Sequence, residues 1–334
     1  MRRTEALQRA ENTKRTGEVK MPEGCKRHKQ PRVTVIIPTY NRANEIGRAI
    51  MSVTNQSYPH WKLLVVDDGS TDDTEAKMRE WTRKDERISY YRMHGNKGVC
   101  HALNQALKLV DTEFMVQVDS DDWLEPSALE VLIKEMDQAP AATALAYGNH
   151  VQWTGSSKSP VMKRRSYRSD QRYDLIAWTS SMYPRFYRTS CLREVGGWET
   201  DDKYGGRYME DRRIMFKLIE RYDFRWVDRH LYNLTREHQK GRLTLQENKH
   251  KYNEIQKEMI TRYLKKWGDK YYPWFYLSNG WLQVQLIARD KFSPPPPQKP
   301  SSFPHSARAV HWTGSRMGNS NISPGNYRIF RNNS

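Results

Sequence analysis

Acidic side chains are concentrated at three places in this chain of 334 residues, and the densest cluster is DSDDW, Asp119–Trp123. Its three carboxylates occupy four positions directly after an apolar stretch. Carboxylates this close repel one another in a low-dielectric cleft, and a hard divalent cation relieves the repulsion. Oxygen ligands without clustered Cys or His favour Mg²⁺ or Mn²⁺, ions that bridge carboxylates to a diphosphate. An acidic surface turn that caps the next helix is the alternative explanation.

The second acidic cluster, VVDDGSTDDT (Val65–Thr74), also follows an apolar stretch. Capping of the next helix explains Asp72 and Asp73 well. It explains Asp67 and Asp68 less well. Their carboxylates are suited to accept a hydrogen bond from a base N–H or a ribose hydroxyl. The segment therefore predicts one edge of a nucleotide site.

Further polar segments carry weaker signals. In GNKGVCHALNQAL a glycine-containing loop with Lys97 opens a helix, whose N-terminus can receive a phosphate, although the spacing matches no dinucleotide or P-loop fingerprint. In YMEDRR, Glu210 and Asp211 begin a predicted helix. One of them is suited to act as a general base, unless both are surface acids paired with arginine. His238, in a polar loop, is either a metal ligand, a phosphate contact or simply exposed.

These side chains must be held by alternating strands and helices. Short β-branched runs predict buried strands at 33–38, 62–66, 88–91 and 113–119. Apolar residues at helical spacing predict helices at 46–53, 75–83, 99–110 and 128–136. This alternation predicts an α/β fold with a mostly parallel central sheet. The acidic turns fall at the carboxyl ends of its strands, where open α/β sheets bind their ligands.

Beyond residue 140 the pattern is less regular. We expect strands at 144–153 and 224–228, and helices at 208–219 and 252–267. The aromatic segment 271–288 either packs on the domain, forms a dimer contact or lies on a membrane face. The predicted organisation is a basic flexible arm (1–32), an α/β domain (33–245) with a nucleotide-binding half (33–140) and an acceptor half (141–245), a helical extension (246–290) and a Pro-rich, basic, disordered tail (291–334).

Charge is unevenly distributed along the chain. Of the net +17, residues 1–32 hold +6, residues 291–334 hold +6 and the remainder holds +5. A polyanionic partner, such as nucleic acid, an acidic glycan or a peripheral membrane face, is therefore expected for the arms. The sequence contains no apolar stretch of 18 residues and no signal-peptide core, and its three cysteines are scattered. We expect a cytoplasmic protein without a transmembrane segment.

Several segments together resemble the family 2 glycosyltransferases, which have the Rossmann-like GT-A fold. The resemblance covers about residues 32–244 and rests on TVIIPTYNRANEIGRAIMSVTNQSYPHWKLLVVDDGSTDDT, NKGVCHALNQAL, VDSDDWLEP, YRTSCLREVGGWET and MED. The QxxRW motif of processive polysaccharide synthases is absent from the sequence. This departure from the processive members of the family implies that a protein of this kind adds a single sugar or a limited number of sugars.

The resemblance implies a role for each matched residue. A nucleotide-sugar, by family habit a UDP-sugar, would be bound by Pro38, Tyr40, Arg42, Asp67, Asp68, Lys97, Gly98 and Asp119. Asp68 would accept a hydrogen bond from the uracil ring. Mn²⁺ or Mg²⁺ would be held by Asp119, Asp121, Asp122 and His238. Asp211 would be the catalytic base of an inverting displacement, and Glu210 would help to orient the acceptor or the base.

The expected function is thus metal-dependent transfer of a sugar to an acceptor hydroxyl, on a glycan or another polyanionic polymer. One alternative is transfer to modified bases of DNA. The other is a non-catalytic polyanion-binding protein on the same scaffold. Salt-sensitive binding without hydrolysis of any sugar donor would single out that last alternative.

Overall fold

The computed structural model describes residues 30–163, 165–177, 181–236 and 246–291. Contacts divide the chain after Gln30, and the fold below is that of the second unit. Most of the predicted arm and tail lies outside the described residues. Arg32, which we assigned to the arm, belongs to the folded unit. Its guanidinium donates hydrogen bonds to Glu113 at 3.0 Å and to Asp137 at 2.9 Å.

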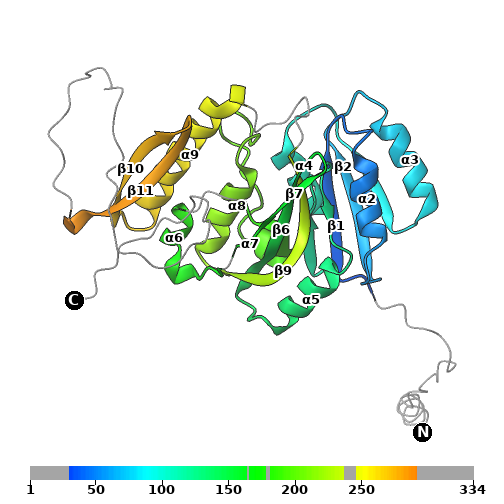
Figure 1. Ribbon diagram of the computed structural model, residues 1–334, viewed down its shortest axis with the longest axis horizontal. Coiled ribbons are helices and arrows are strands. Elements are labelled where there is room, and N and C mark those ends of the chain that lie inside the picture. Colours follow the sequence, from blue (N-terminus) through cyan, green and yellow to red (C-terminus); the bar gives the residue numbers. More distant parts are fainter. Residues whose placement is uncertain (1–29, 164, 178–180, 237–245, 292–334) are drawn as a thin grey trace, which may run out of the picture. The chain divides into compact units, whose positions relative to one another are not determined.

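Parallel strands form the first half of the central sheet (Figure 1). In spatial order they are β3 (Ile88–Arg92), β2 (Trp61–Asp67), β1 (Val33–Thr39) and β4 (Phe114–Gln117). Alternate residues of a strand point to opposite faces, so Val33, Val35 and Ile37 of β1 enter one core while Ile36 enters the other. A strand covered on both faces appears in the sequence as a continuous apolar run, which is why these strands were predictable.

The second half of the sheet is mixed. Next to β4 lies β8 (Tyr183–Arg188), which runs antiparallel to both β4 and β6 (Thr143–Thr154). Strand β9 (Asp223–Thr235) is parallel to β6, and the short β5 (Trp123–Leu124) and β7 (Ser157–Val161) are antiparallel to β9 and β6. The parallel arrangement predicted for the sheet therefore describes strands β1 to β4 and not the strands from β8 onward.

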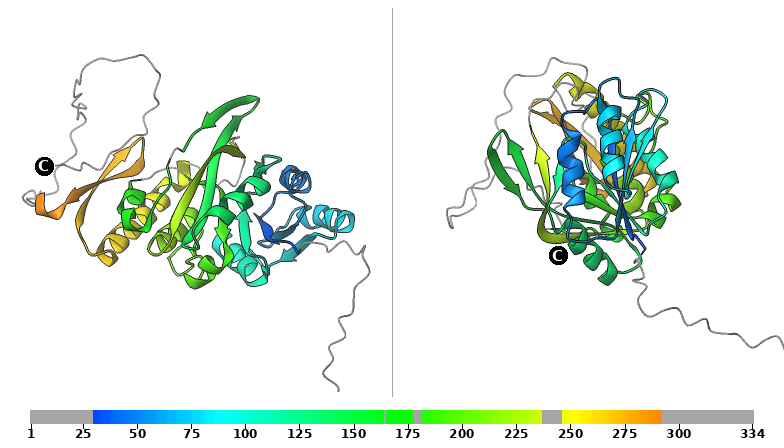
Figure 2. Two further views of the ribbon diagram at one scale, coloured as in Figure 1. Left: turned by 90° about the horizontal axis from the view of Figure 1, so that it is seen from below. Right: turned by 90° about the vertical axis from the view of Figure 1, so that its right-hand side faces the viewer.

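Helices cover both faces of the sheet (Figures 1 and 2). The first core contains the apolar sides of α2 (Ile46–Thr54), α3 (Thr74–Lys84) and α5 (Ala128–Gln138). The second contains those of α4 (Val99–Leu109), α6 (Tyr173–Ile176), α7 (Thr189–Glu194) and α8 (Glu210–Ile219). Short 3₁₀ turns lie at Ser169–Gln171, Gln246–Asn248 and Arg289–Lys291.

The C-terminal extension is only partly helical. Helix α9 (Lys249–Lys266) follows the predicted spacing and packs Tyr263 edge-on against Phe216 of α8 at 5.2 Å. The segment after it forms a hairpin of β10 (Tyr271–Ser278) and β11 (Trp281–Ala288), which corrects the helical prediction for 271–288. Asn279 and Gly280 both have positive φ, 51° and 79°, as a two-residue hairpin turn requires.

Within the described ranges, no helix is long and apolar enough to cross a membrane.

Candidate active site

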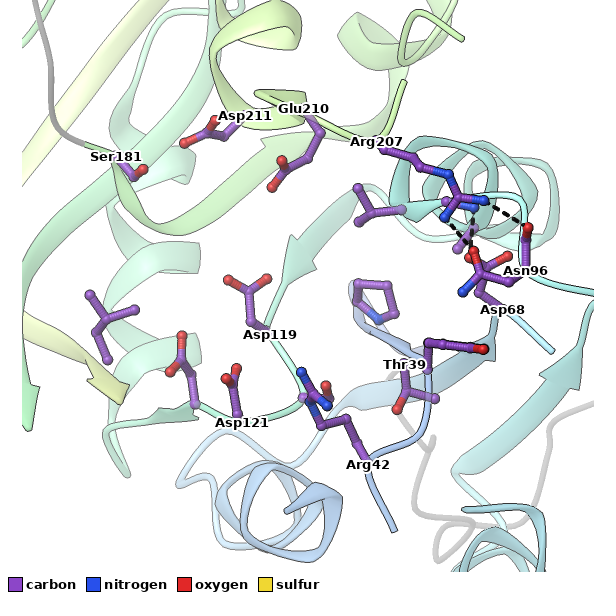
Figure 3. A pocket seen from close by; sticks show the side chains of 18 of the residues that line it. Thr39, Arg42, Asp68, Asn96, Asp119, Asp121, Ser181, Arg207, Glu210 and Asp211 are labelled. Atoms are coloured by element: carbon purple, nitrogen blue, oxygen red, sulfur yellow. Dashed lines mark hydrogen bonds between the residues drawn. The ribbon is translucent and has the colours of Figure 1, made fainter. Parts of the chain in front are cut away.

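A cavity of about 350 Å³ opens where the carboxyl ends of β1, β2 and β4 meet the start of α8 (Figure 3). Parallel strands end at one edge, so β1 and β2 bring Thr39 into register with Asp67. Most of the predicted site residues line the cavity: Pro38, Tyr40, Arg42, Asp68, Gly98, Asp119, Asp121, Asp122, Glu210 and Asp211. Asp67 and Lys97 are not among its lining residues. His238 lies outside the described residues.

Asp68 is fixed at one end of the cavity by a close approach of two loops. Its carboxylate accepts hydrogen bonds of 2.7 Å from the backbone N–H groups of Lys97 and Gly98. Gly69 makes this approach possible, because its φ is +78° and a Cβ there would lie 2.7 Å from the backbone of Gly95. Burial raises the pKa of Asp68 above its usual range. A carboxylate has further lone pairs, so Asp68 can still accept a bond from a ligand.

Asp67 has a structural task, which corrects its predicted role at the nucleotide. The residue has no exposed surface. Its Oδ1 accepts from the Ser70 backbone N–H at 2.8 Å and the Ser70 hydroxyl at 2.6 Å. Its Oδ2 accepts from the Tyr90 hydroxyl at 2.5 Å. Asp67 therefore shapes the turn that presents Asp68.

We expect Asp67→Ala to lower the free energy of unfolding by on the order of 3 kcal/mol, because it leaves buried donors of Ser70 and Tyr90 unpaired. Denaturant unfolding monitored by circular dichroism measures this. Asp73→Ala is the matched control. Asp73 precedes α3 in the same turn, but its exposed side chain makes no capping bond, so its loss should change stability by less than about 0.5 kcal/mol. Equal effects of the two substitutions would contradict the structural role.

The DSDDW segment places its acids in different surroundings. Asp119 and Asp121 face the cavity from its floor (Figure 3). Asp122 is 1% exposed, and it accepts from the Tyr232 hydroxyl at 2.9 Å and from the Thr235 backbone N–H at 2.8 Å. Burial, reinforced by the charges of Asp119 and Asp121, raises the pKa of Asp122 well above its usual range. Asp122 is thus better placed to tie this segment to β9 than to hold a metal.

Arg185 is a buried cation that joins the two acidic walls of the cavity. Its side chain is 1% exposed, and its Nη2 donates to Asp119 Oδ1 at 2.9 Å. Its Nη1 lies 4.0 Å from Asp211 Oδ2. Gln117, its neighbour across β4 and β8, also donates to Asp119 Oδ1, at 3.1 Å. Buried charges of this kind need partners, and here each partner is a carboxylate of the cavity.

Glu210 and Asp211 begin α8 and face the acids of the floor (Figure 3). Met209, directly before them, has a left-handed backbone with φ of 59°, which ends the preceding loop and starts the helix. The carboxylate of Asp211 accepts a hydrogen bond of 2.8 Å from the backbone N–H of Arg212. Burial and the nearby charge of Asp211 raise the pKa of Glu210 from 4.5 to about 7.

The raised pKa of Glu210 predicts a pH dependence of stability. Between pH 4.5 and about 7 the folded protein holds a proton on Glu210 that the unfolded chain has released, so the free energy of unfolding falls as the pH rises through this window. Glu210→Gln removes that contribution. Unfolding measured in EDTA at pH 5 and pH 7.5 should show a smaller fall for the variant than for the parent chain. Identical falls would contradict the assignment.

The structure adds lining residues that the sequence did not single out: Thr39, Asn96, Val99, Ala102, Ser120, Ser181, Tyr183, Arg207, Leu234 and Tyr252. Arg207 matters most for charge. Its guanidinium donates to the Asn96 side chain and, at 2.8 Å, to the Asn96 carbonyl, beside Asp68 (Figure 3). The side chain of Lys97 is exposed, and Arg207, not Lys97, is the cation that lines this part of the cavity. The signal available was a lone arginine in a glycine-rich turn, just before the MED segment.

The donor atoms of the floor fit a hard divalent cation. Asp119 and Asp121 offer carboxylate oxygens, which Mg²⁺ and Mn²⁺ prefer, and such ions often take only one or two carboxylates besides water and phosphate oxygens. The part of the chain that the structure describes contains no group of three or more His, Cys, Asp or Glu side chains arranged to hold a metal.

Comparison with known proteins identifies the family of the segment that forms most of this cavity. Residues 34–196 match the model of "Glycosyl transferase family 2". This part of the chain belongs to that family. The matched segment contains the strands and acidic turns of the nucleotide-binding half and ends before Glu210 and Asp211.

Relatives of the family 2 domain include two bacterial proteins. TuaG of Bacillus subtilis (strain 168), named a putative teichuronic acid biosynthesis glycosyltransferase, is 35% identical over 113 residues, which cover 34% of this chain and 45% of TuaG. WfgD of Escherichia coli, named a UDP-Glc:alpha-D-GlcNAc-diphosphoundecaprenol beta-1,3-glucosyltransferase, is 37% identical over 118 residues, covering 35% of this chain and 45% of WfgD. The chain therefore spans less than half the length of these relatives.

The fold is shared with a solved glycosyltransferase. The crystal structure of S. aureus TarS 1-349 in complex with UDP-GlcNAc superimposes with a TM-score of 0.57 and 22% identity, covering 70% of this chain and 66% of that chain. The expected GT-A fold is thereby confirmed, with the sheet mixed in its second half.

Proposed function

We propose that this protein is a glycosyltransferase that moves a sugar from a UDP-sugar to an acceptor hydroxyl with inversion of the anomeric centre. One observation carries the proposal. Asp119 and Asp121, in the segment after β4, face the adjacent acids that begin α8 across one cavity, and Arg185 lies between the two walls. The family of the nucleotide-binding half and the donor in the name of WfgD support the reaction and the nucleotide.

The nucleotide part of the donor would lie along the end of β1 and the turn at Asp68. Tyr40 is 39% exposed at the rim, so its ring is available to stack on a base. Asp68 is held by backbone N–H groups with lone pairs to spare for a base N–H. Arg42 and Arg207 also line the cavity and would balance the charge of the phosphates.

A divalent cation, Mn²⁺ or Mg²⁺, would be held by Asp121 and Asp119. When bound, it would neutralise the charge that grows on the leaving diphosphate. The protein's own contribution is to keep these carboxylates in place. Arg185 and Gln117 fix Asp119, and the bonds of Asp122 to β9 fix the segment that carries Asp121.

Asp211 would remove the proton from the attacking hydroxyl. It lies on the wall opposite the metal-binding acids, and Nη1 of the buried Arg185 lies 4.0 Å from its Oδ2. Glu210, protonated in part near neutral pH, would orient the acceptor by donating a hydrogen bond.

The acceptor we propose is a glycan or another hydroxyl-bearing polymer of acidic character. The basic residues of the chain and the role in the name of TuaG support an acidic polymer. A cytoplasmic location fits the two described cysteines, Cys100 and Cys191, which are buried free thiols.

The test measures release of the nucleotide from a series of nucleotide-sugars in the presence of Mn²⁺. The first round contains no acceptor, and the second adds acceptors grouped by their charge. We expect release from one UDP-sugar, accelerated by one class of acceptor and lost in EDTA. Salt-sensitive binding of polyanions without release from any donor would overturn the proposed enzyme.

A further inference from the structure

The hairpin β10–β11 lies against α9 (Figure 2). Phe275, Val284 and Leu286 share one face of the hairpin and pack against the core that also contains the apolar side of α9. On the other face, Trp274 lies opposite Gln285, Tyr276 opposite Gln283 and Tyr272 opposite Ile287. We call these six residues the outer face. Trp274 is 47% exposed and Tyr272 is 37% exposed.

The outer face combines aromatic rings with side-chain amides. A pyranose has an apolar face of C–H groups, which stacks on a ring, and an edge of hydroxyls, which bond to amide N–H and C=O groups. A membrane-inserting surface would pair most of its rings with aliphatic side chains. Here Ile287 lies opposite Tyr272, but the two central rings, Trp274 and Tyr276, lie opposite Gln285 and Gln283. The chemistry at the centre of this face therefore favours a sugar.

Positive charge adjoins the outer face. A hollow beside it is lined by Lys257, Tyr272, Pro273, Trp274 and Phe275. Residues 249–291 contain nine Lys or Arg and four Asp or Glu. A ligand that carries carboxylate or phosphate groups would be attracted by this excess of positive charge.

An aromatic contact links the hairpin to the candidate active site. Trp281 of β11 packs edge-on against Tyr252 of α9, with ring centroids 5.9 Å apart. Tyr252 lines the cavity and packs against Tyr208, two residues before Glu210, at 5.2 Å. The hairpin is therefore anchored to the wall of the cavity that we assign to the acceptor.

We propose that the outer face binds an acidic oligosaccharide segment of the acceptor, away from the sugar that reacts. The identification of this ligand as acceptor rests on the proposed function, whereas the binding itself does not.

The test measures binding of a hexuronic-acid hexasaccharide to the full chain without donor, by calorimetry. Trp274→Ala should weaken binding at least tenfold, and Lys257→Gln should weaken it more than it weakens binding of a neutral glucose hexasaccharide. Tyr91→Ala is the matched control, because Tyr91 is 38% exposed on β3. It should leave the affinity unchanged. Hydrolysis of the UDP-sugar should be the same in all three variants and serves as the check on folding.

Unchanged affinity in Trp274→Ala would overturn the proposal, as would an equal loss in the Tyr91 control. Two other results would overturn it if the affinity for the oligosaccharide stayed unchanged. Release of the Trp274→Ala chain from phosphatidylglycerol vesicles would indicate a membrane-binding face, and conversion of a dimer into a monomer would indicate a dimer interface. Asp211→Asn should bind the hexasaccharide as the parent does. If no variant or parent transfers sugar but Trp274-dependent binding persists, the proposed function fails and the binding surface stands.

Discussion

Asp211→Asn should lower kcat about 10²–10⁴-fold while the Kd for the UDP-sugar stays within about twofold, because the substitution removes a general base without touching the donor side of the cavity. Asp211 begins α8 on the wall that faces Asp119, and Arg185 lies 4.0 Å from its carboxylate. Asparagine keeps the shape and the bond from the Arg212 backbone N–H but cannot take a proton. Steady-state transfer kinetics and donor titration by calorimetry measure the two quantities.

Glu210→Gln is the matched control for this prediction, since Glu210 is the adjacent acid on the same helix turn. Glutamine resembles the protonated form that Glu210 adopts in part near pH 7, so it should reduce kcat much less than Asp211→Asn. The opposite ranking, with Glu210→Gln inactive and Asp211→Asn active, would move the base to Glu210. A similar small effect of both would remove general-base catalysis from this wall.

Asp121→Asn should abolish the stimulation of donor binding by Mn²⁺. We expect the Kd for the UDP-sugar in Mn²⁺ to rise at least tenfold, to the value that the parent chain shows in EDTA, because a charged ligand of the cation is lost. The melting temperature should fall less than it does for Asp122→Asn, because Asp121 is only half-buried whereas Asp122 is fully buried. Calorimetric titration in Mn²⁺ and in EDTA measures the effect.

Asp122→Asn separates metal binding from structure in the same segment. Both oxygens of Asp122 are bonded to β9, so this substitution should lower the melting temperature more than Asp121→Asn does. Mn²⁺ should still strengthen donor binding in that variant. If Asp121→Asn kept the full Mn²⁺ effect while Asp122→Asn lost it without destabilisation, the ligand assignment within DSDDW would have to be exchanged.

The nucleotide-binding half was largely predictable from the sequence. Strands such as β1 and β2 are covered by helices on both sides, and their apolar runs end at polar turns that mark the ligand edge. The second half was less predictable because its strands obtain their partners from distant parts of the chain. The two-residue strand β5 is defined only by its pairing with β9. The β10–β11 hairpin had a local signal, Asn-Gly between alternating residues, which the aromatic content obscured.

The residues of the candidate site also divide into those that the sequence predicted and those that it did not. The acids that follow β2 and β4 were found because the carboxyl ends of parallel strands lie at the same edge of a sheet, so their position in the sequence is enough to place them there. Arg185 was missed because its importance depends on β8 pairing with β4, which brings it to Asp119. In the sequence, Arg185 is only one of two arginines in the aromatic-rich strand β8, and nothing distinguishes it from Arg188. Asp67 was misassigned because adjacent acids point in opposite directions, one into the turn and the other into the cavity.

The anomeric configuration of the transferred sugar tests the central claim most directly. A single displacement at this cavity, with Asp211 as base, converts an α-linked UDP-sugar into a β-linked product. Proton NMR of the isolated product, through the coupling constant of its anomeric proton, reads this out. We predict the β configuration from the parent chain and, over the same reaction time, far less product from Asp211→Asn. An α-linked product, or equal product from both chains, would contradict the account.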